Sequence, residues 1–119
     1  MNKEFIPYEQ ALELKELGFN ENCMFPYHRN NTEYIDSAHV ELVNYNATEE
    51  LVSAVLYQQA FRFFREKGFL MDITSHDKDV HEFYIRWHPN KPIFSDYYNT
   101  YEETELECLK KLIEIAKNK

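Results

Sequence analysis

Glycine is scarce in this chain, and its scarcity excludes several classes of site. Only two glycines, Gly18 and Gly68, occur among 119 residues. Phosphate-binding loops and dinucleotide-binding fingerprints need several closely spaced glycines, because the backbone must approach the ligand. The serine-hydrolase pattern G-x-S-x-G is also missing. We therefore expect no P-loop, no Rossmann-type cofactor site and no nucleophile elbow.

Cysteine and the usual metal-binding patterns are equally sparse. Cys23 and Cys108 are too few for a disulfide framework, which favours a reducing compartment. Neither Cys-x-x-Cys nor His-Glu-x-x-His occurs, and His76 and His81 flank a stretch whose polarity is explained by a turn. Nothing singles out one catalytic carboxylate pair among 21 acids. We expect no metal, no cofactor and no enzymatic activity.

Long apolar runs are absent too. No stretch approaches the roughly 20 residues of a membrane span, and the first residues, MNKEFIPYEQ, lack the apolar region of a signal peptide. We expect a cytoplasmic protein. Hydrophobic residues nevertheless make up 44% of the chain and aromatic residues 16%. This composition predicts a single compact domain over 1–119 with a real core.

Basic residues are outnumbered, and the imbalance lies mostly in one half of the chain. The formal net charge is -8, with ten acids and three bases in residues 1–50 against eleven and ten in residues 51–119. A strongly acidic surface disfavours nucleic acid and favours a basic partner surface. Simple solubility explains the same charge equally well.

Three helices are expected from apolar spacing and terminal residues. The first runs over 7–17, and the second begins near Asn46 or Thr48; each ends before a glycine followed by Phe. Glycine in the left-handed conformation is a common helix terminator. The third helix covers 100–117, with Thr100 and Glu103 forming a capping box.

Alternating apolar residues predict strands between these helices. Residues 69–74 and 80–88 alternate around a polar turn, and 93–98 forms a third short strand. Residues 23–28 and 39–45 are expected to form a short hairpin. The fold class is α+β: an N-terminal helix and hairpin in an acidic part, 1–45, precede a helix–three antiparallel strands–helix sandwich.

The order α-β-β-β-α of residues 46–119 is also that of double-stranded-RNA-binding domains. Those domains carry lysines at the start of the last helix, where they contact phosphates. Here the corresponding stretch, 101–105, contains three carboxylates, which would repel the backbone. A nucleic-acid-binding module therefore remains an alternative rather than the leading hypothesis.

The stretch YQQAFRFFREKGF, residues 57–69, combines aromatic and basic residues as nucleic-acid grips do. Helical spacing assigns Tyr57, Phe61 and Phe64 to a core stripe. Arg62 and Arg65 fall outside the stripe and are too few for a phosphate track.

Aromatic and arginine side chains near the third strand are candidate interface anchors. Trp87 shares the parity of Phe83 and Ile85, so we expect it to be buried. Tyr84, Arg86 and His88 would then line the opposite face, joined by Tyr98.

Three segments resemble a family of small uncharacterised phage and prophage proteins: IPYEQALELKELGFNE (6–21), YQQAFRFFREKGF (57–69) and TYEETELECLKKLIEIAK (100–117). The match covers about half of the chain at the level of motifs, and Thr104 and Glu107 depart from the alanines of the family pattern. The resemblance brings no catalytic residues. It implies an accessory gene of a virus or mobile element.

Combined with the charge, the resemblance suggests a non-enzymatic anti-defence protein that binds a basic host protein. Its concrete form is an anti-CRISPR inhibitor of an RNA-guided nuclease, whose nucleic-acid channel is basic. The expected electrostatic contacts are Glu9, Glu13, Glu16, Glu33 and Glu41. A further alternative is a sponge that sequesters a nucleotide, for which Arg62, Arg65, Arg86 and Lys91 would have to converge.

Overall fold

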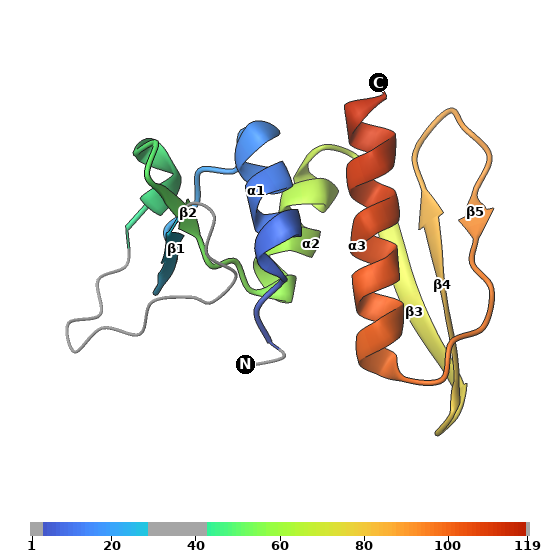
Figure 1. The fold of residues 1–119 in the computed structure, drawn as a ribbon. Helices are drawn as coiled ribbons and strands as arrows, with labels where there is room; N and C mark the ends of the chain where they lie inside the picture. Colours follow the sequence, from blue (N-terminus) through green and yellow to red (C-terminus); the bar gives the residue numbers. More distant parts are fainter. Residues whose placement is uncertain (1–3, 29–42, 119) are drawn as a thin grey trace. The chain divides into compact units, whose positions relative to one another are not determined.

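The computed structural model describes residues 4–28 and 43–118, whose contacts form two compact units divided between Gln59 and Ala60 (Figure 1). The elements in chain order are α1 (Tyr8–Glu16), β1 (Pro26–His28), the 3-10 helix η1 (Tyr45–Ala47), β2 (Leu51–Ser53), α2 (Tyr57–Glu66), β3 (Leu70–Asp77), β4 (Val80–Arg86), β5 (Ile93–Phe94) and α3 (Tyr101–Lys117). This confirms the α+β class, with the order α-β-β-β-α from α2 onward. None of the helices described is long and apolar enough to cross a membrane.

The predicted subdivision differs from the one that the contacts give. We expected an acidic part over 1–45 and a core over 46–119, whereas the first unit extends to Gln59 and includes β2 and the start of α2. That the whole chain forms a single domain stays a prediction.

The first unit is built around segment 51–56, which contains β2 and has backbone partners on both sides. On one side, β2 pairs antiparallel with β1, with Tyr27 opposite Val52. On the other, the Ile6 N–H donates to the Val55 carbonyl at 2.8 Å. Side chains 52–55 are all buried, because neighbours cover both faces of the segment. The buried Tyr27 hydroxyl donates to the Ile6 carbonyl at 2.8 Å and ties the two sides together.

The predicted start of the second helix was wrong. The helix begins at Tyr57, and residues 51–53 form β2 instead. Nearly every residue of 51–55 is buried, so the apolar residues of this run fit helical spacing as well as strand spacing. Hydrophobic periodicity therefore cannot distinguish a strand from a helix in such a run. The helix start is marked by Gln59, whose side-chain oxygen accepts the Leu56 N–H at 3.1 Å, as a residue at the third helical position can.

Asn46, expected to cap that helix, has another role. It lies in η1, where its side-chain amide donates to the Phe19 carbonyl at 3.0 Å and its oxygen accepts the Ser53 N–H at 2.8 Å. It thereby holds β2 against the end of α1. Of the predicted hairpin of 23–28 with 39–45, the structure describes a bridge between Cys23 and Val43, and residues 39–42 lie outside the described part. The strand β1 itself pairs with β2, a partner that the prediction did not include.

The second unit is a three-stranded antiparallel sheet, ordered β3-β4-β5, with α3 packed across β3 and β4 (Figure 1). Phe83 and Ile85 of β4 and Leu109, Leu112 and Ile113 of α3 are buried. The α3 N-terminus forms as predicted, because the Thr100 hydroxyl oxygen accepts the Glu103 N–H at 3.0 Å. Strand alternation is confirmed: the face formed by His81, Phe83 and Ile85 is the buried one.

The β3–β4 turn is tighter than the polar stretch 75–79 indicated, since β3 continues to Asp77. His81 fastens this end of the sheet. Its Nδ1 lies 2.7 Å from the Ser75 hydroxyl and its Nε2 lies 3.0 Å from the Lys78 carbonyl. Because the carbonyl can only accept, the neutral imidazole carries its proton on Nε2 and accepts from Ser75 at Nδ1. These two hydrogen bonds hold the turn between β3 and β4 together.

The free edge of β3 carries its own hydrogen-bond partner. The backbone groups of Phe83 point toward β5, since the Ser95 N–H donates to the Phe83 carbonyl at 2.9 Å. Phe83 and Ile73, which are opposite one another, therefore form a pair that shares no backbone hydrogen bond. The N–H of Ile73 consequently points away from β4, toward the outer edge of the sheet. The Asp72 carboxylate accepts that N–H at 2.9 Å.

Both glycines end helices, as predicted, with φ of 94° at Gly18 and 96° at Gly68. The Gly68 N–H donates to the Arg65 carbonyl at 3.0 Å, and the Phe69 N–H donates to the Phe64 carbonyl at 3.1 Å. These two hydrogen bonds form the Schellman motif. The Phe64 and Phe69 rings also meet edge to face, with centroids 6.0 Å apart.

We predict that Gly68→Ala lowers the free energy of unfolding by about 1 kcal/mol, because a Cβ disfavours the left-handed backbone. The space around Gly68 is open, so the strain is confined to the backbone. Urea unfolding of the variant measures the change. Gly68→Asn is the matched control and should lose less, since asparagine tolerates this conformation. Equal stability of Gly68→Ala and wild type would contradict the assignment.

Candidate binding surfaces

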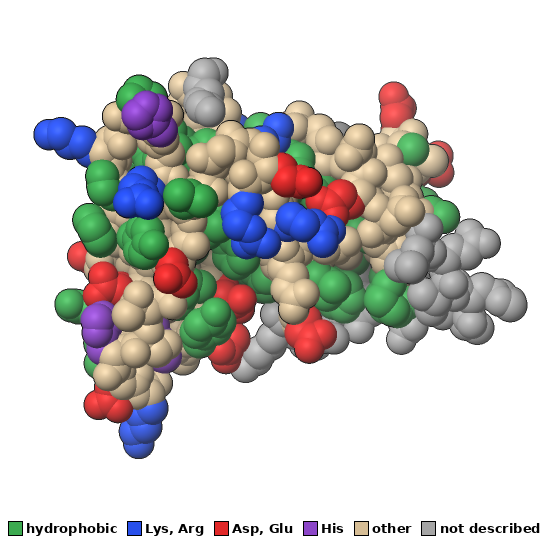
Figure 2. All heavy atoms as spheres, turned by 180° about the vertical axis from the view of Figure 1, so that it is seen from behind, with side chains coloured by type: hydrophobic (Ala, Val, Ile, Leu, Met, Phe, Trp, Pro, Cys, Tyr) green, Lys and Arg blue, Asp and Glu red, His purple; other side chains and the backbone are tan. Residues whose placement is uncertain are grey.

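The outward face of the sheet in the second unit exposes large apolar side chains. Leu70 is 50% exposed and Phe94 is 68% exposed. Tyr84 lies between the strands that carry them, and its ring contacts Phe94 at a centroid distance of 6.1 Å. Figure 2, seen from the side opposite to Figure 1, shows hydrophobic side chains interspersed with basic and acidic ones there. Aromatic and arginine residues gathered on one exposed face are typical of interfaces.

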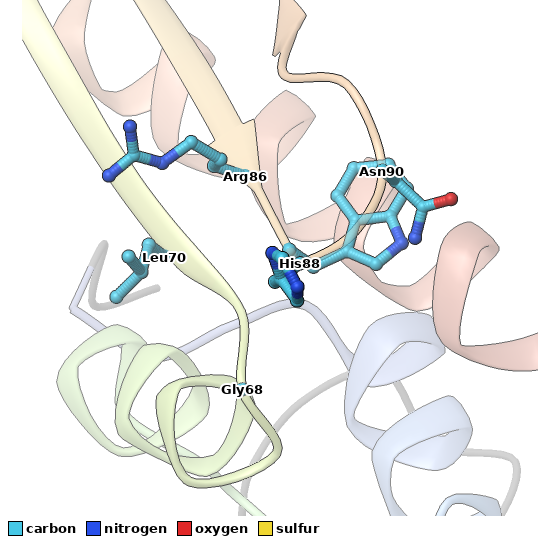
Figure 3. Close-up of a pocket in the computed structure, with 6 residues that line it drawn as sticks. Gly68, Leu70, Arg86, His88 and Asn90 are labelled. Carbon is cyan, nitrogen blue, oxygen red and sulfur yellow. The ribbon is translucent and has the colours of Figure 1, made fainter.

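A pocket of about 390 Å³ opens at one end of this face (Figure 3). Its lining residues come from the end of α2, the start of β3 and the end of β4: Gly68, Leu70, Arg86, Trp87, His88 and Asn90. Leu70 and Arg86 are opposite one another in the β3–β4 ladder. The Asn90 N–H donates to the Trp87 carbonyl at 2.9 Å, which folds the chain back at the pocket wall.

The reversal at Gly68 explains why these residues meet. It sends the chain directly from α2 into β3, so that Leu70 faces outward beside the end of β4. Trp87 has inward parity and contacts Phe69, with ring centroids 5.9 Å apart. Trp87 is half-buried rather than fully buried as we expected, because it lies one residue past the end of β4.

The carboxylates of α1 form a second candidate surface, in the first unit. Glu9 and Glu16 are exposed and Glu13 is half-buried. Lys15 is the only Lys or Arg among residues 4–28 and 43–59, and its ammonium donates to the carbonyls of Thr48 and Leu51, the latter at 2.7 Å. The one described cation of this unit is therefore directed at its own backbone.

The structure brings together only some of the predicted partner-binding residues. Arg86 and His88 line the same pocket, and Tyr84 is on the same sheet face. Arg62 and Arg65 are exposed on α2, but neither lines the pocket, and nor does Lys91. Of the four cations that the nucleotide sponge would require, only Arg86 lines the pocket.

The remaining predicted residues lie elsewhere. Tyr98 is half-buried, stacks on Phe83 with ring planes 5° apart, and pairs with His81 through its backbone. Its ring therefore belongs to the inner side of the sheet. Glu33 and Glu41 lie outside the residues that the structure describes.

Sequence reasoning missed Leu70, Phe94 and Asn90. The alternation of residues 69–74 places Leu70 on the face opposite to the buried Phe69, so the sequence does contain a signal for the exposure of Leu70. For Phe94 and Asn90 the sequence contains no such signal, because short strands and turns of this kind lack a period.

Burial governs the chemistry of both thiols. It raises the pKa of the Cys23 thiol to about 11 and that of the Cys108 thiol to about 12, with Glu105 adding repulsion at Cys108. Thiols held protonated are poor nucleophiles. Within 4–28 and 43–118, no cluster of three or more His, Cys, Asp or Glu residues could hold a metal ion.

We predict that neither cysteine reacts with iodoacetamide in the native protein at about pH 8, because roughly one thiol in a thousand or fewer is then ionised. Both should be alkylated after unfolding in urea, which is the internal control. Intact-mass spectrometry counts the added groups. Rapid labelling of either thiol in the folded protein would show that it is accessible.

Glu105 gives a second, pH-dependent prediction. Burial, followed by repulsion from Glu102, raises the pKa of the Glu105 carboxyl. The folded state therefore holds its proton more tightly, and this contribution to stability is lost as pH rises through the unfolded value of 4.5 to the folded pKa. At pH 7, Glu105→Gln should add a few tenths of a kcal/mol, a gain reduced by solvent screening.

Urea unfolding of Glu105→Gln across this pH range provides the measurement. Its advantage over wild type should shrink toward pH 4, where both side chains are neutral. Glu114→Gln, which changes an exposed carboxylate of the same helix, should give no gain. An advantage of Glu105→Gln that does not vary with pH would contradict the assignment.

No known protein family, curated protein or solved structure matches this chain. What the protein does must therefore be inferred from its residues, its geometry and the resemblance of its motifs.

Proposed function

We propose that the protein is a non-enzymatic binding protein whose first unit docks on a basic surface of another protein. The observation that carries this proposal is the charge balance of the unit around α1. Glu9 and Glu16 are exposed on this helix, and Lys15 is the single Lys or Arg among the described residues of the unit. The described part of the unit is therefore strongly acidic.

The charge of the unit supports the same conclusion. Its described residues contain seven carboxylates, on Glu4, Glu9, Glu13, Glu16, Glu21, Glu49 and Glu50, against the single Lys15. An excess of carboxylates attracts a basic partner over several ångströms and raises the association rate. Such attraction weakens with salt, which distinguishes it from apolar docking.

The specific form of the proposal is an anti-defence protein of a phage or prophage, acting on an RNA-guided nuclease. It is supported by the family resemblance and by complementarity between an acidic surface and a nucleic-acid channel, which is positively charged. The carboxylates would occupy positions that otherwise hold backbone phosphates. Loading the nuclease with guide RNA should then reduce binding.

The RNA-binding alternative gains little from the geometry. Glu102 and Glu103 stand in the first turn of α3, where a double-stranded-RNA-binding domain needs cations. These carboxylates suit the positive end of the helix dipole but would repel a phosphate backbone.

We predict that Glu9→Lys with Glu16→Lys weakens binding to a purified, guide-free RNA-guided nuclease by about tenfold or more, because both changes replace attraction with repulsion. Calorimetry at low and moderate salt gives the affinities, and the difference should narrow as salt increases. The control, Glu66→Lys with Glu114→Lys, changes net charge equally but lies in the second unit.

The outcomes separate a specific surface from bulk charge. An equal loss in the control variant would leave only non-specific electrostatics and would contradict the proposed contact. Undiminished binding by Glu9→Lys with Glu16→Lys would do the same. If neither guide-free nor guide-loaded nuclease binds the wild-type protein, the nuclease form of the proposal fails.

A further inference from the structure

The outward face of the sheet in the second unit carries an exposed aromatic row. The other face of the sheet, which contains Phe83 and Ile85, is buried, and α3 packs across its strands. On the outward face Phe94 is 68% exposed, and its ring lies beside that of Tyr84, with centroids 6.1 Å apart. The two residues are opposite one another in the β4–β5 ladder, so they form one row across the strands. Large apolar side chains gathered on an exposed face are typical of a surface that another molecule covers.

The charges of β4 lie on either side of this aromatic row. Arg86 and Glu82 are each two residues from Tyr84, one toward either end of the strand, so alternation puts all three on the outward face. The His76 ring holds the Glu82 carboxylate, since its Nε2 lies 2.7 Å from one carboxylate oxygen. Arg86 is exposed, and its guanidinium extends away from the His88 ring (Figure 3). The strand therefore presents a positive group beyond one side of the row and a negative group beyond the other.

This order of charge fits a second copy of the same chain. A two-fold axis along the aromatic row, perpendicular to the strands, lays one sheet face on another with the strands reversed. Tyr84 then meets the partner's Tyr84, and Arg86 meets the partner's Glu82. The symmetry forms this ion pair twice, whereas a uniformly basic or uniformly acidic partner would satisfy only one of the two charges.

Asp72, which lies in the same row on β3, does not oppose this arrangement. It is opposite Tyr84 in the β3–β4 ladder, and its carboxylate accepts the Ile73 N–H at 2.9 Å. Because that N–H points to the outer edge of the sheet, the carboxylate is held at the edge rather than over the centre. The two copies of this charge would stand at the rim of the interface, where water solvates and screens them.

We propose that the protein forms a two-fold symmetric dimer through the outward face of this sheet, with Tyr84 and Phe94 at the centre and Arg86 paired with the partner's Glu82. The three strands and the seven residues of β4 give a face of about 14 by 24 Å, from about 4.8 Å between strands and 3.4 Å per residue. Faces of this size are at the small end for a specific interface, so we expect a dissociation constant of about 10–100 μM. The dimer does not depend on the proposed docking of the first unit.

Sedimentation equilibrium of the whole chain measures this self-association directly. The buffer contains about 0.15 M salt, which largely screens the repulsion between two chains of net charge -8. We expect the mass to rise from the 14.4 kDa of one chain toward twice that value between about 1 μM and 1 mM protein. A single species with the mass of one chain over this whole range overturns the proposal.

Phe94→Ser and Arg86→Glu test the two parts of the interface. Both side chains are exposed, so each variant should keep its fold, which circular dichroism checks. Each should weaken dimerisation by about tenfold or more, Phe94→Ser through lost apolar contact and Arg86→Glu because two carboxylates then meet. Lys78→Glu, at the turn between β3 and β4, changes net charge as Arg86→Glu does and should dimerise as wild type. Undiminished dimerisation of either test variant overturns the proposal, and so does an equal loss in Lys78→Glu.

An exchange of charges tests the predicted pairing itself. Glu82→Arg should dimerise as poorly as Arg86→Glu, because two guanidinium groups then meet. A mixture of the two variants should form a heterodimer, since the two-fold axis places each introduced charge opposite a group of the other sign. Failure of the mixture to associate overturns the proposed arrangement. Glu9→Lys with Glu16→Lys, in the first unit, should dimerise as wild type does, which separates this result from the fate of the docking proposal.

Discussion

The reversal of the chain at Gly68 is the constraint on which the second unit depends. A positive φ at this residue lets α2 stop and β3 start without an intervening loop. Phe69 then packs on Phe64 behind it and on Trp87 across the sheet. Because side chains alternate along a strand, fixing Phe69 inward fixes Leu70 outward. The exposed face and the pocket both follow from that one orientation.

The features that could be predicted from sequence are those encoded within a few residues. The two glycine stops, the Thr100 cap and the alternation of β3 and β4 each depend on neighbours in the chain, and the structure confirms them. The start of α2 could not be predicted in this way. Residues 51–55 become β2 and the short segment after it because β1 and residues 4–6 bond to their two sides, and those partners are distant in sequence.

The candidate sites show the same division between local and non-local information. Strand alternation alone predicted that Tyr84, Arg86 and His88 would share a face. The pocket itself required Gly68 of the α2–β3 turn, Leu70 of β3 and Asn90 of the segment after β4 to lie near Arg86. No local sequence pattern predicts this meeting. Likewise, the acidity of the first half was evident from composition, whereas the bonds from the Lys15 ammonium to the Thr48 and Leu51 carbonyls were not.

The bond between the Asp72 carboxylate and the Ile73 amide has a consequence for how the sheet can be used. An open strand edge beside apolar side chains normally invites any extended peptide to add to it. Here an outward amide is already occupied from within the strand, so main-chain recognition is discouraged at that point. Contacts with the sheet must then be made through side chains, which discriminate among partners as a bare backbone edge cannot.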